Sequence, residues 1–276
     1  MPELPEVEST RRAVQGALEG RRIVHVEVAR ARMLRRQPEP FDFAPRMVGR
    51  TIISLTRHGK FLLGALSRDL TWVTHLGMSG RVRLADRDDS HEAHTNVVIR
   101  VGGGVEFRLI DPRTFGFVAV LTPEEYAESS LATLGPDALT DLPTAAQLWV
   151  RLEHRSAPIK ALLLDQTILA GIGNIYADEA LHHAAISPHR PGGAITMAEL
   201  AALRRAIART LTAGLRHGGT SLDDLAYLLP DGRAGEYLAR LRVYGREGER
   251  CVRCGGSIVR HVLRGRSAFW CQTCQT

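Results

Sequence analysis

The stretch Cys251-Val-Arg-Cys254, with its counterpart Cys271-Gln-Thr-Cys274, decides the fold of the C-terminal end and contains every cysteine of the 276-residue chain. The two Cys-x-x-Cys pairs are separated by sixteen residues, a spacing typical of a four-cysteine zinc ribbon. Disulfides are the alternative, but the chain begins without an export signal and disulfides are rare in reducing compartments. We therefore predict one structural zinc ion held by Cys251, Cys254, Cys271 and Cys274.

The segment between the cysteine pairs has the pattern of a β-hairpin and carries positive charge. Residues 257–263 and 266–271 resemble strands, and residues 263–266 would form the tip. Residues 237–276 contain eight arginines and two glutamates, which leaves 28 basic and 28 acidic residues elsewhere. The whole formal excess of +6 therefore lies in this tail. Such a basic hairpin is suited to phosphate groups, so the sequence favours a nucleic-acid partner.

Upstream of this tail the sequence has helical periodicity. Candidate helices cover residues 122–132, 144–154, 158–165, 175–184 and 197–215. The turn Gly171-Ile-Gly-Asn174 precedes one of them and would direct backbone N–H groups at an anion. A glycine turn before a helix is a weak signal alone. Together with the basic tail, it favours a helix-two-turn-helix motif that contacts a DNA phosphate. Residues 218–237 form either a functional loop or a surface connection.

The N-terminal half has the period-two pattern of β-strands. Candidate strands cover residues 24–28, 50–66, 70–76, 80–84, 96–101 and 105–110. Short strands without intervening helices predict an antiparallel sandwich or barrel. The expected fold is α+β and multidomain: an N-terminal helix with a β-sandwich over 1–128, a helical domain over 129–237 and a zinc finger over 238–276.

The N-terminus begins Met1-Pro-Glu-Leu-Pro-Glu-Val-Glu8. Removal of Met1 would leave the secondary amine of Pro2 beside the carboxylates of Glu3 and Glu6. An α-amino group has a pKa near 8, so about a tenth of it is the free, nucleophilic amine at pH 7. The alternative is an ordinary helix start, because proline and glutamate both suit a first helical turn.

Lysine is used at two positions only, Lys60 and Lys160, among 36 basic residues. Because lysine offers a compact point charge where arginine offers a planar fork, both are candidates for phosphate contacts, although chance is an equal explanation. Without an export signal or a membrane-spanning apolar run, we expect a soluble protein of the cytoplasm; a bacterial source and an association with the nucleoid are implied only by the family resemblance that follows.

Several separated motifs in one order together resemble the bacterial formamidopyrimidine-DNA glycosylase family, also called 8-oxoguanine DNA glycosylases. The resemblance extends over essentially the whole chain. It rests on Pro2 to Glu8, His58-Gly-Lys60, His75-Leu-Gly-Met-Ser-Gly80, Asp111-Pro-Arg113 with Phe115-Gly116, Gly171 to Glu179, Val243-Tyr-Gly-Arg246 and the zinc hairpin. The architecture of that family agrees with the order of elements predicted above.

The resemblance implies a bifunctional enzyme of base-excision repair. A DNA glycosylase would remove oxidised purines from double-stranded DNA, and an apurinic or apyrimidinic lyase would cleave the strand by β- and δ-elimination through a Schiff base at Pro2. We expect a monomer that binds no membrane and whose only cofactor is the structural zinc. Catalytic roles are implied for Pro2, Glu3, Lys60 and Arg266. Further DNA contacts are implied for His75, Met78, Arg113, Phe115, Lys160, Asn174 and Tyr244.

Two departures and two alternatives accompany this resemblance. Thr114 stands where many members have a second arginine, and the loop over residues 218–237 is atypical, so the base preference is less well defined. An endonuclease VIII-like glycosylase for oxidised pyrimidines shares Pro2 and Glu3, but Leu4 and the Asp111 to Arg113 element favour the purine enzyme. A non-catalytic zinc DNA-binding protein would explain the basic tail but not the terminal Pro2 and Glu3.

Overall fold

The computed structural model describes residues 2–222 and 225–276. Met1, whose removal is predicted, and positions 223 and 224 of the expected loop lie outside the described residues. Within the described ranges, no helix has both the length and the apolar character that crossing a bilayer requires.

The chain divides into two compact units, each made of two segments. Unit 1 combines the residues up to 133 with 217–238, and unit 2 combines 134–216 with 239–276. This division differs from the predicted boundaries at 128 and 237. The loop that follows residue 217 belongs with the N-terminal unit, and the cysteine-rich hairpin belongs with the helices.

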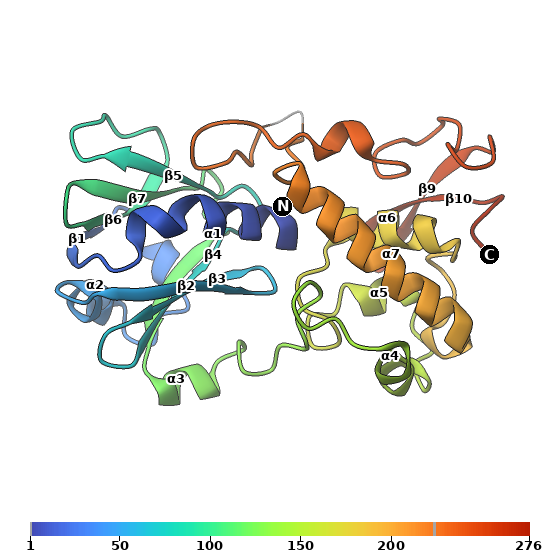
Figure 1. Cartoon of the computed structure of the whole chain (residues 1–276), viewed down its shortest axis with the longest axis horizontal. Helices are drawn as coiled ribbons and strands as arrows, with labels where there is room; N and C mark the ends of the chain where they lie inside the picture. Colours follow the sequence, from blue (N-terminus) through green and yellow to red (C-terminus); the bar gives the residue numbers. More distant parts are fainter. Residues whose placement is uncertain (1, 223–224) are drawn as a thin grey trace. The chain divides into compact units, whose positions relative to one another are not determined.

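Unit 1 consists of helix α1 (Leu4–Leu18) and two four-stranded antiparallel sheets, with α1 running alongside the strands (Figure 1). The strand order is β1-β6-β7-β5 in one sheet and β2-β3-β4-β8 in the other. The strands are β1 (Ile23–Val28), β2 (Ile52–His58), β3 (Phe61–Leu66), β4 (Leu70–His75), β5 (Arg81–Asp86), β6 (Thr95–Val101), β7 (Val105–Ile110) and β8 (Phe117–Leu121). Short helices are η1 (Ala31–Leu34), η2 (Pro40–Asp42), α2 (Phe43–Met47) and α3 (Pro123–Glu128).

Apolar side chains from α1 and both sheets form one core. Val14 and Leu18 of α1 are fully buried with Trp72 of β4 and Phe107 of β7, whose rings meet edge to face with centroids 4.9 Å apart. A Cβ atom on Gly64 would lie 2.8 Å from the Trp72 ring, so glycine leaves the space that the indole occupies. The predicted N-terminal helix with an antiparallel β-sandwich is confirmed.

Two details of this unit differ from the sequence prediction. Strand β8 was not expected, because its residues are almost continuously apolar and lack the alternation of a half-buried strand. Helix α3 is shorter than the predicted span 122–132. It begins after Thr122, whose side chain accepts the N–H of Glu125, and it ends before Ser129.

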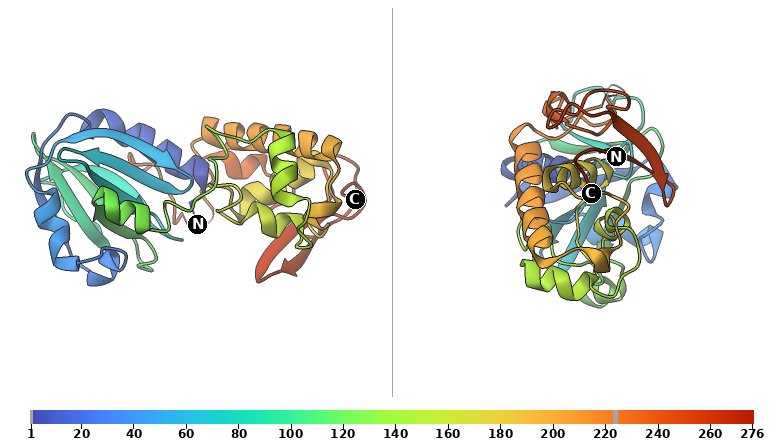
Figure 2. Two further views of the ribbon diagram at one scale, coloured as in Figure 1. Left: turned by 90° about the horizontal axis from the view of Figure 1, so that it is seen from below. Right: turned by 90° about the vertical axis from the view of Figure 1, so that its right-hand side faces the viewer.

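The described part of unit 2 combines helices with a two-stranded hairpin (Figure 2). Its α-helices are α4 (Ala145–Leu152), α5 (Ile159–Leu163), α6 (Asn174–Ala184) and α7 (Met197–Arg216), and short 3-10 helices are η3 (Gly192–Ala194) and η4 (Tyr237–Arg240) at the unit boundary. The hairpin pairs β9 (Ile258–Leu263) with β10 (Arg266–Cys271). The predicted helical domain and C-terminal hairpin are thus both present.

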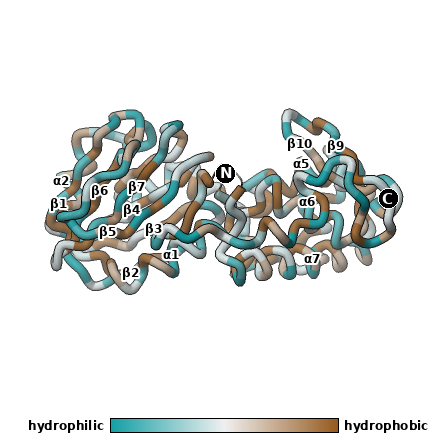
Figure 3. Tube along the Cα trace, turned by 90° about the horizontal axis from the view of Figure 1, so that it is seen from above, coloured by the Kyte–Doolittle hydropathy of each residue, from teal (hydrophilic) through white to brown (hydrophobic). Residues whose placement is uncertain are grey.

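Helix α7 is the long amphipathic helix of this unit. Leu200, Leu203, Ile207 and Leu211 recur at helical spacing and are buried, and Figure 3 shows hydrophobic and hydrophilic residues alternating along α7. Helix α6 packs against it so closely that a Cβ atom on Gly214 would lie 2.5 Å from the Tyr176 ring. This pairing holds α6, and with it the glycine turn that precedes α6, in a fixed place within unit 2.

Candidate functional site

The first residues of the chain are packed into unit 1. Pro2 and Glu3 are buried, and they directly precede α1. Glu6 lies in the first turn of that helix, and its Oε2 atom accepts the N–H of Glu3 at 2.8 Å. The helix-start interpretation is confirmed, because Glu6 caps the first turn of α1. The same hydrogen bond fixes the backbone that carries Pro2 and Glu3, whose catalytic role stays a prediction.

The other oxygen of the Glu6 carboxylate holds the loop over residues 217–238. Its Oε1 atom accepts the N–H of Thr220 at 2.7 Å. Gly219 has a φ of +86°, and a Cβ atom there would lie 2.8 Å from the Glu6 side chain, so the approach requires glycine. The Tyr227 hydroxyl donates to the Glu6 carbonyl at 3.2 Å. Glu6 thus joins the N-terminus to the loop, which explains why that segment belongs to unit 1.

Lys60 and His75 lie at the same end of the β2-β3-β4-β8 sheet, beside its two central strands. Lys60 lies in the β2–β3 turn, and its neighbour Phe61 pairs with His75 across β3 and β4, with ring centroids 4.9 Å apart. Burial, with smaller effects from the charges of Lys60 and Arg35, lowers the pKa of His75 to about 4. Its Nδ1 atom accepts the N–H of Gly77 at 3.1 Å. The ring is therefore neutral at pH 7, with its proton assigned to Nε2 by this hydrogen bond.

The buried carboxylate of Asp111 brings together the two turns that carry Met78, Arg113 and Phe115. Asp111 Oδ1 accepts the Ser79 hydroxyl at 2.6 Å, and Oδ2 accepts the N–H of Gly116 at 2.7 Å. The Arg113 guanidinium stacks on the Phe115 ring at 4.6 Å from its centroid, and this ring is 39% exposed. An exposed aromatic residue on a tightly held turn is suited to insertion between stacked groups. We call residues 113–116 the wedge turn.

Arg35, just after η1, clamps the wedge turn and was not singled out from the sequence. Its guanidinium donates to the carbonyls of Phe115 and Gly116, both at 2.5 Å, and lies over the Phe117 ring at 5.3 Å. Thr114 adopts a left-handed φ of +52°, which is uncommon for a β-branched residue. The only sequence signal for this contact is the cluster of arginines between residues 30 and 36. The cluster does not identify the partners of Arg35, which lie about 80 residues away in the chain.

In unit 2, Gln166 shapes the glycine turn before α6. Its Oε1 atom accepts the N–H of Gly171 at 2.9 Å, and its Nε2 atom donates to the Ile172 carbonyl at 3.0 Å. Gly171 has a φ of +108°, a conformation that favours glycine. The turn places the half-buried Asn174 at the first position of α6, at the positive end of the helix dipole.

Glu179 on α6 positions another predicted DNA contact, Tyr244. The fully buried Glu179 carboxylate accepts the N–H groups of Arg242, Val243 and Tyr244 at 2.9 to 3.0 Å. Burial raises the pKa of Glu179, and these three N–H groups act in the opposite direction. Glu179 therefore anchors the turn that carries Tyr244, whereas the sequence marked it only as part of a motif.

Lys160 lies in the interior of unit 2. Its side chain is 0% exposed and forms an ion pair with Asp178 at 2.7 Å. Its Nζ atom also donates to the Ser267 carbonyl at 2.5 Å, while Asp178 accepts the N–H of Phe269 at 2.9 Å. Lys160 therefore has structural partners in this unit, and its predicted DNA contact stays a prediction. The pair instead holds β10, the strand that begins with Arg266.

The four cysteines form a metal site of the expected kind. All four sulfur atoms lie within 4.8 Å of one another, with Cys254 to Cys271 at 3.5 Å and Cys251 to Cys274 at 3.8 Å. A tetrahedral zinc ion with Zn–S bonds of about 2.3 Å has sulfur atoms roughly 3.8 Å apart, so the cluster fits zinc. An N–H group, that of Arg253, points at Cys251 Sγ from 3.4 Å. The predicted four-cysteine zinc finger is confirmed.

The hairpin of this zinc finger presents its arginines at the tip. Arg264 and Gly265 have φ values of +47° and +76° and connect the paired Leu263 and Arg266 in a two-residue turn. Arg264, Gly265 and Arg266 are exposed. The predicted tip is therefore correct in its position, and Arg266 is accessible to a phosphate.

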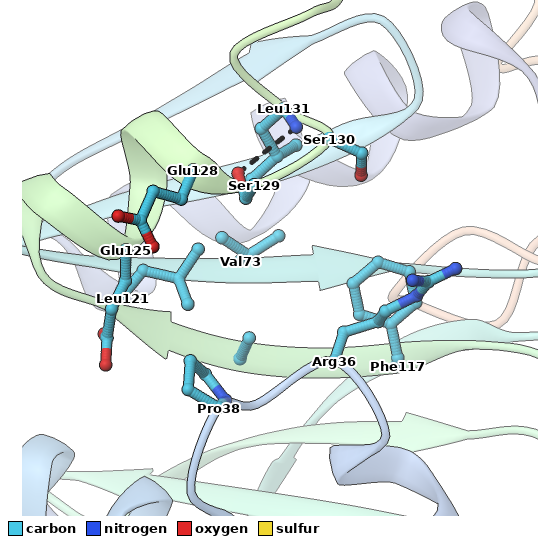
Figure 4. A pocket seen from close by; sticks show the side chains of 11 residues that line it. Arg36, Pro38, Val73, Phe117, Leu121, Glu125, Glu128, Ser129, Ser130 and Leu131 are labelled. Carbon is cyan, nitrogen blue, oxygen red and sulfur yellow. Dashed lines mark hydrogen bonds between the residues drawn. The ribbon is translucent and has the colours of Figure 1, made fainter.

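A separate pocket of about 360 Å³ lies over β4 and β8 in unit 1 (Figure 4). Val73, Phe117 and Leu121 supply apolar lining, and Glu125 and Arg36 lie at its sides. The residues that line it include none of those predicted for catalysis or DNA contact. Unit 1 carries Pro2, Glu3, Lys60, His75 and the wedge turn with Met78, whereas unit 2 carries Lys160, Asn174, Tyr244, Arg266 and the cysteines.

Comparison with known proteins agrees with this arrangement along the whole chain. Three family models match: the formamidopyrimidine-DNA glycosylase N-terminal domain over residues 1–118, the formamidopyrimidine-DNA glycosylase H2TH domain over 134–225, and the zinc finger found in FPG and IleRS over 248–276.

Similar sequences and solved structures have the same name. The formamidopyrimidine-DNA glycosylases of Sphingopyxis alaskensis and Rhizorhabdus wittichii are 44% and 45% identical, each over 100% of both chains. The MutM (Fpg) protein from Thermus thermophilus is 39% identical with a TM-score of 0.88, covering 99% of this chain and 98% of that one. The Lactococcus lactis Fpg in complex with abasic-site DNA is 29% identical with a TM-score of 0.90 over 100% of both chains. The chain belongs to the formamidopyrimidine-DNA glycosylase family.

Proposed function

We propose that this chain is a bifunctional base-excision repair enzyme, which removes oxidised purines from double-stranded DNA and then cleaves the strand at the resulting site. The observation that carries the proposal is the buried Pro2-Glu3 terminus and its link to the loop through Glu6. One carboxylate oxygen of Glu6 accepts the N–H of Glu3, and the other accepts the N–H of Thr220. A terminus that served only to start a helix would not need a second anchor on a distant loop. The family membership supports the glycosylase reaction, and the terminal amine supports the lyase reaction.

The chemistry follows from the secondary amine of Pro2 once Met1 is removed. Its lone pair attacks C1′ of the damaged nucleotide, the bond to the base breaks, and the base leaves with a proton. Glu3 protonates the sugar ring oxygen so that the ring opens and a cationic iminium remains. Loss of a proton from C2′ then expels the 3′ phosphate by β-elimination, and a second elimination expels the 5′ phosphate. Because proline is a secondary amine, the iminium is cationic without an added proton.

Binding of the DNA is assigned to groups on both units. Lys60 and His75 of unit 1 and Asn174, Tyr244 and Arg266 of unit 2 would contact phosphates beside the flipped nucleotide. Neutral His75 would do so through its Nε2–H, because its Nδ1 atom is occupied by Gly77. Base extrusion costs least at a damaged or mispaired base.

The wedge turn would replace the extruded base. Phe115 is exposed, and its ring is stacked with the Arg113 guanidinium, so the two can enter the helix as one unit. Met78, on the turn joined to the wedge turn through Asp111, would fill the remaining space. The zinc ion holds the knuckles of the hairpin when bound and takes part in no step of the reaction.

Borohydride trapping tests the nucleophile. Full-length protein is incubated with a duplex that contains 8-oxoguanine, and reduction converts the Schiff base into a stable crosslink. Pro2→Gly should crosslink and cleave much more slowly than wild type, because a glycine imine must first gain a proton. Pro5→Ala, one turn away and with Pro2 intact, is the matched control. Wild-type rates for Pro2→Gly, or for protein that retains Met1, would contradict the assignment.

A panel of lesion duplexes tests the substrate class. A solved Lactococcus lactis Fpg complex, 30% identical with a TM-score of 0.89, contains DNA with an oxidized pyrimidine, so pyrimidine lesions belong in the panel. We expect faster release of 8-oxoguanine and formamidopyrimidine than of thymine glycol. The reverse order would assign the chain to oxidised pyrimidines instead.

A further inference from the structure

One buried histidine on α6 contacts the zinc cluster. His182 is 0% exposed, and its Nε2 atom lies 3.3 Å from Sγ of Cys251. We propose that His182 donates a hydrogen bond to the zinc-bound thiolate of Cys251 and thereby slows the loss of the metal. The cysteine pattern gave no indication of this contact, because 69 residues separate the two side chains in the sequence.

The hydrogen bond has a defined direction. A zinc-bound cysteine is a thiolate and can only accept a hydrogen bond, so the proton must lie on Nε2 of His182. The Nδ1 atom of His182 is buried and has no hydrogen-bond partner among the described residues. A bare lone pair at Nδ1 costs less than a buried N–H without an acceptor, so the surroundings of Nδ1 favour the same tautomer.

His182 is an additional donor to a sulfur atom that already accepts one backbone hydrogen bond. Cys251 Sγ receives the N–H of Arg253 at 3.4 Å, and the cysteine is 3% exposed. At such a buried site water contributes little to stabilising the thiolate charge, so each protein donor matters more.

A second contact ties the same knuckle to α6. The Arg253 guanidinium donates to the carbonyl of His183 at 3.0 Å. The end of α6 therefore meets the zinc knuckle through one side-chain and one backbone group. This arrangement makes His182 a positioning residue for Cys251. His182 is not itself a zinc ligand, because the ligand atoms that lie within 4.8 Å of one another are the four cysteine sulfur atoms.

Loss of zinc tests the proposal directly. Zinc-loaded, full-length protein is mixed with an excess of a chromogenic chelator, and zinc transfer is followed by absorbance. His182→Phe keeps a ring of similar size without a donor. Because groups that hydrogen-bond to metal ligands typically change metal affinity by about 10- to 100-fold, we expect zinc loss to accelerate by about tenfold or more.

Two further variants separate the hydrogen bond from packing. His183→Phe changes the neighbouring residue, whose carbonyl contact to Arg253 is unaffected, and should lose zinc at the wild-type rate. His182→Gln restores an N–H donor at a similar reach and should be slower than His182→Phe. Equal rates for wild type and His182→Phe would overturn the proposal, and so would equally fast loss from both His182 variants.

The tautomer gives a measurement that needs no variant. Long-range ¹H–¹⁵N correlation spectra of the zinc-loaded wild type should show His182 protonated at Nε2. Protonation at Nδ1 instead would refute the hydrogen bond even if a variant failed to fold. None of these measurements depends on glycosylase activity.

Discussion

Replacing Lys160 by methionine should destabilise unit 2 by about 3 to 5 kcal/mol, the usual cost of removing one partner from a buried ion pair. Methionine keeps the length and the apolar contacts of the lysine stem but lacks the ammonium group. The ammonium lies 2.7 Å from Asp178 and also serves the Ser267 carbonyl. The substitution therefore leaves a carboxylate and a carbonyl buried without their donor.

The magnitude can be approached from these two groups. An acceptor left unsatisfied inside a protein costs about 1 to 3 kcal/mol, and more when it is charged, so the carbonyl and the carboxylate together account for the range above. Asp178 keeps its hydrogen bond from the N–H of Phe269 at 2.9 Å. The double variant Lys160→Met with Asp178→Asn should therefore be less destabilised than the sum of the single variants.

The stability lost in Lys160→Met should depend on pH. Burial raises the pKa of Asp178 above its ordinary value, and Lys160 acts against that rise. Without Lys160 the folded-state pKa rises further. Between the pKa of Asp178 in the unfolded chain and its higher pKa in the folded variant, the folded state binds more protons than the unfolded state. The free energy of unfolding therefore falls as the pH rises between these two pKa values. Lys160→Met should be less destabilising at pH 5 than at pH 8.

Urea unfolding and DNA binding together decide between a buried and a phosphate-binding Lys160. Unfolding is followed by tryptophan fluorescence, to which Trp270 on β10, the strand held by the pair, contributes. The affinity of the variant for DNA is measured against salt concentration. Arg266→Ala, at the exposed tip, is the contrasting control and should reduce the salt slope by about one contact without destabilising the fold. Unchanged stability with a reduced slope for Lys160→Met would refute the buried role.

Three more predictions concern residues that the structure places around the site. Arg35→Ala removes two charge-assisted hydrogen bonds from the wedge turn, so single-turnover excision from a lesion duplex should slow by about tenfold, which corresponds to 1.4 kcal/mol, while cleavage of a pre-formed abasic site changes less. His75 should titrate near pH 4 by NMR. Since its folded pKa is lowered, its contribution to stability is complete above about pH 6.5 and is lost as the pH falls toward 4; a titration midpoint above pH 6 would contradict the neutral, half-buried ring. Glu179→Gln should lower the free energy of unfolding by about 1 to 3 kcal/mol, because its hydrogen bonds to three N–H groups lose the charge of their acceptor; unchanged urea unfolding would show that the carboxylate does not hold that turn.

Local patterns in the sequence predicted the elements well. The period-two segments between residues 50 and 110 form strands, and Cys251 to Cys274 enclose the hairpin with its tip where expected. These features depend on residues close together in the chain, so spacing alone is enough to recognise them. Strand β8 was not predicted, because a strand buried on both faces lacks the alternation of apolar and polar residues.

The sequence by itself determined which chemical groups are present: a proline at the second position beside glutamates, four paired cysteines and a basic tail. Only the tertiary structure decided how those groups are used. Glu6 reaches Thr220, Arg35 reaches Phe115, and His182 reaches Cys251, each across 69 or more residues of the chain. Lys160 shows the limit most clearly, because two equally rare lysines looked alike in the sequence. Both lysines are buried, and only the structure shows that Lys160 is paired with the buried carboxylate of Asp178. That pairing depends on packing between distant segments, and no local pattern encodes it.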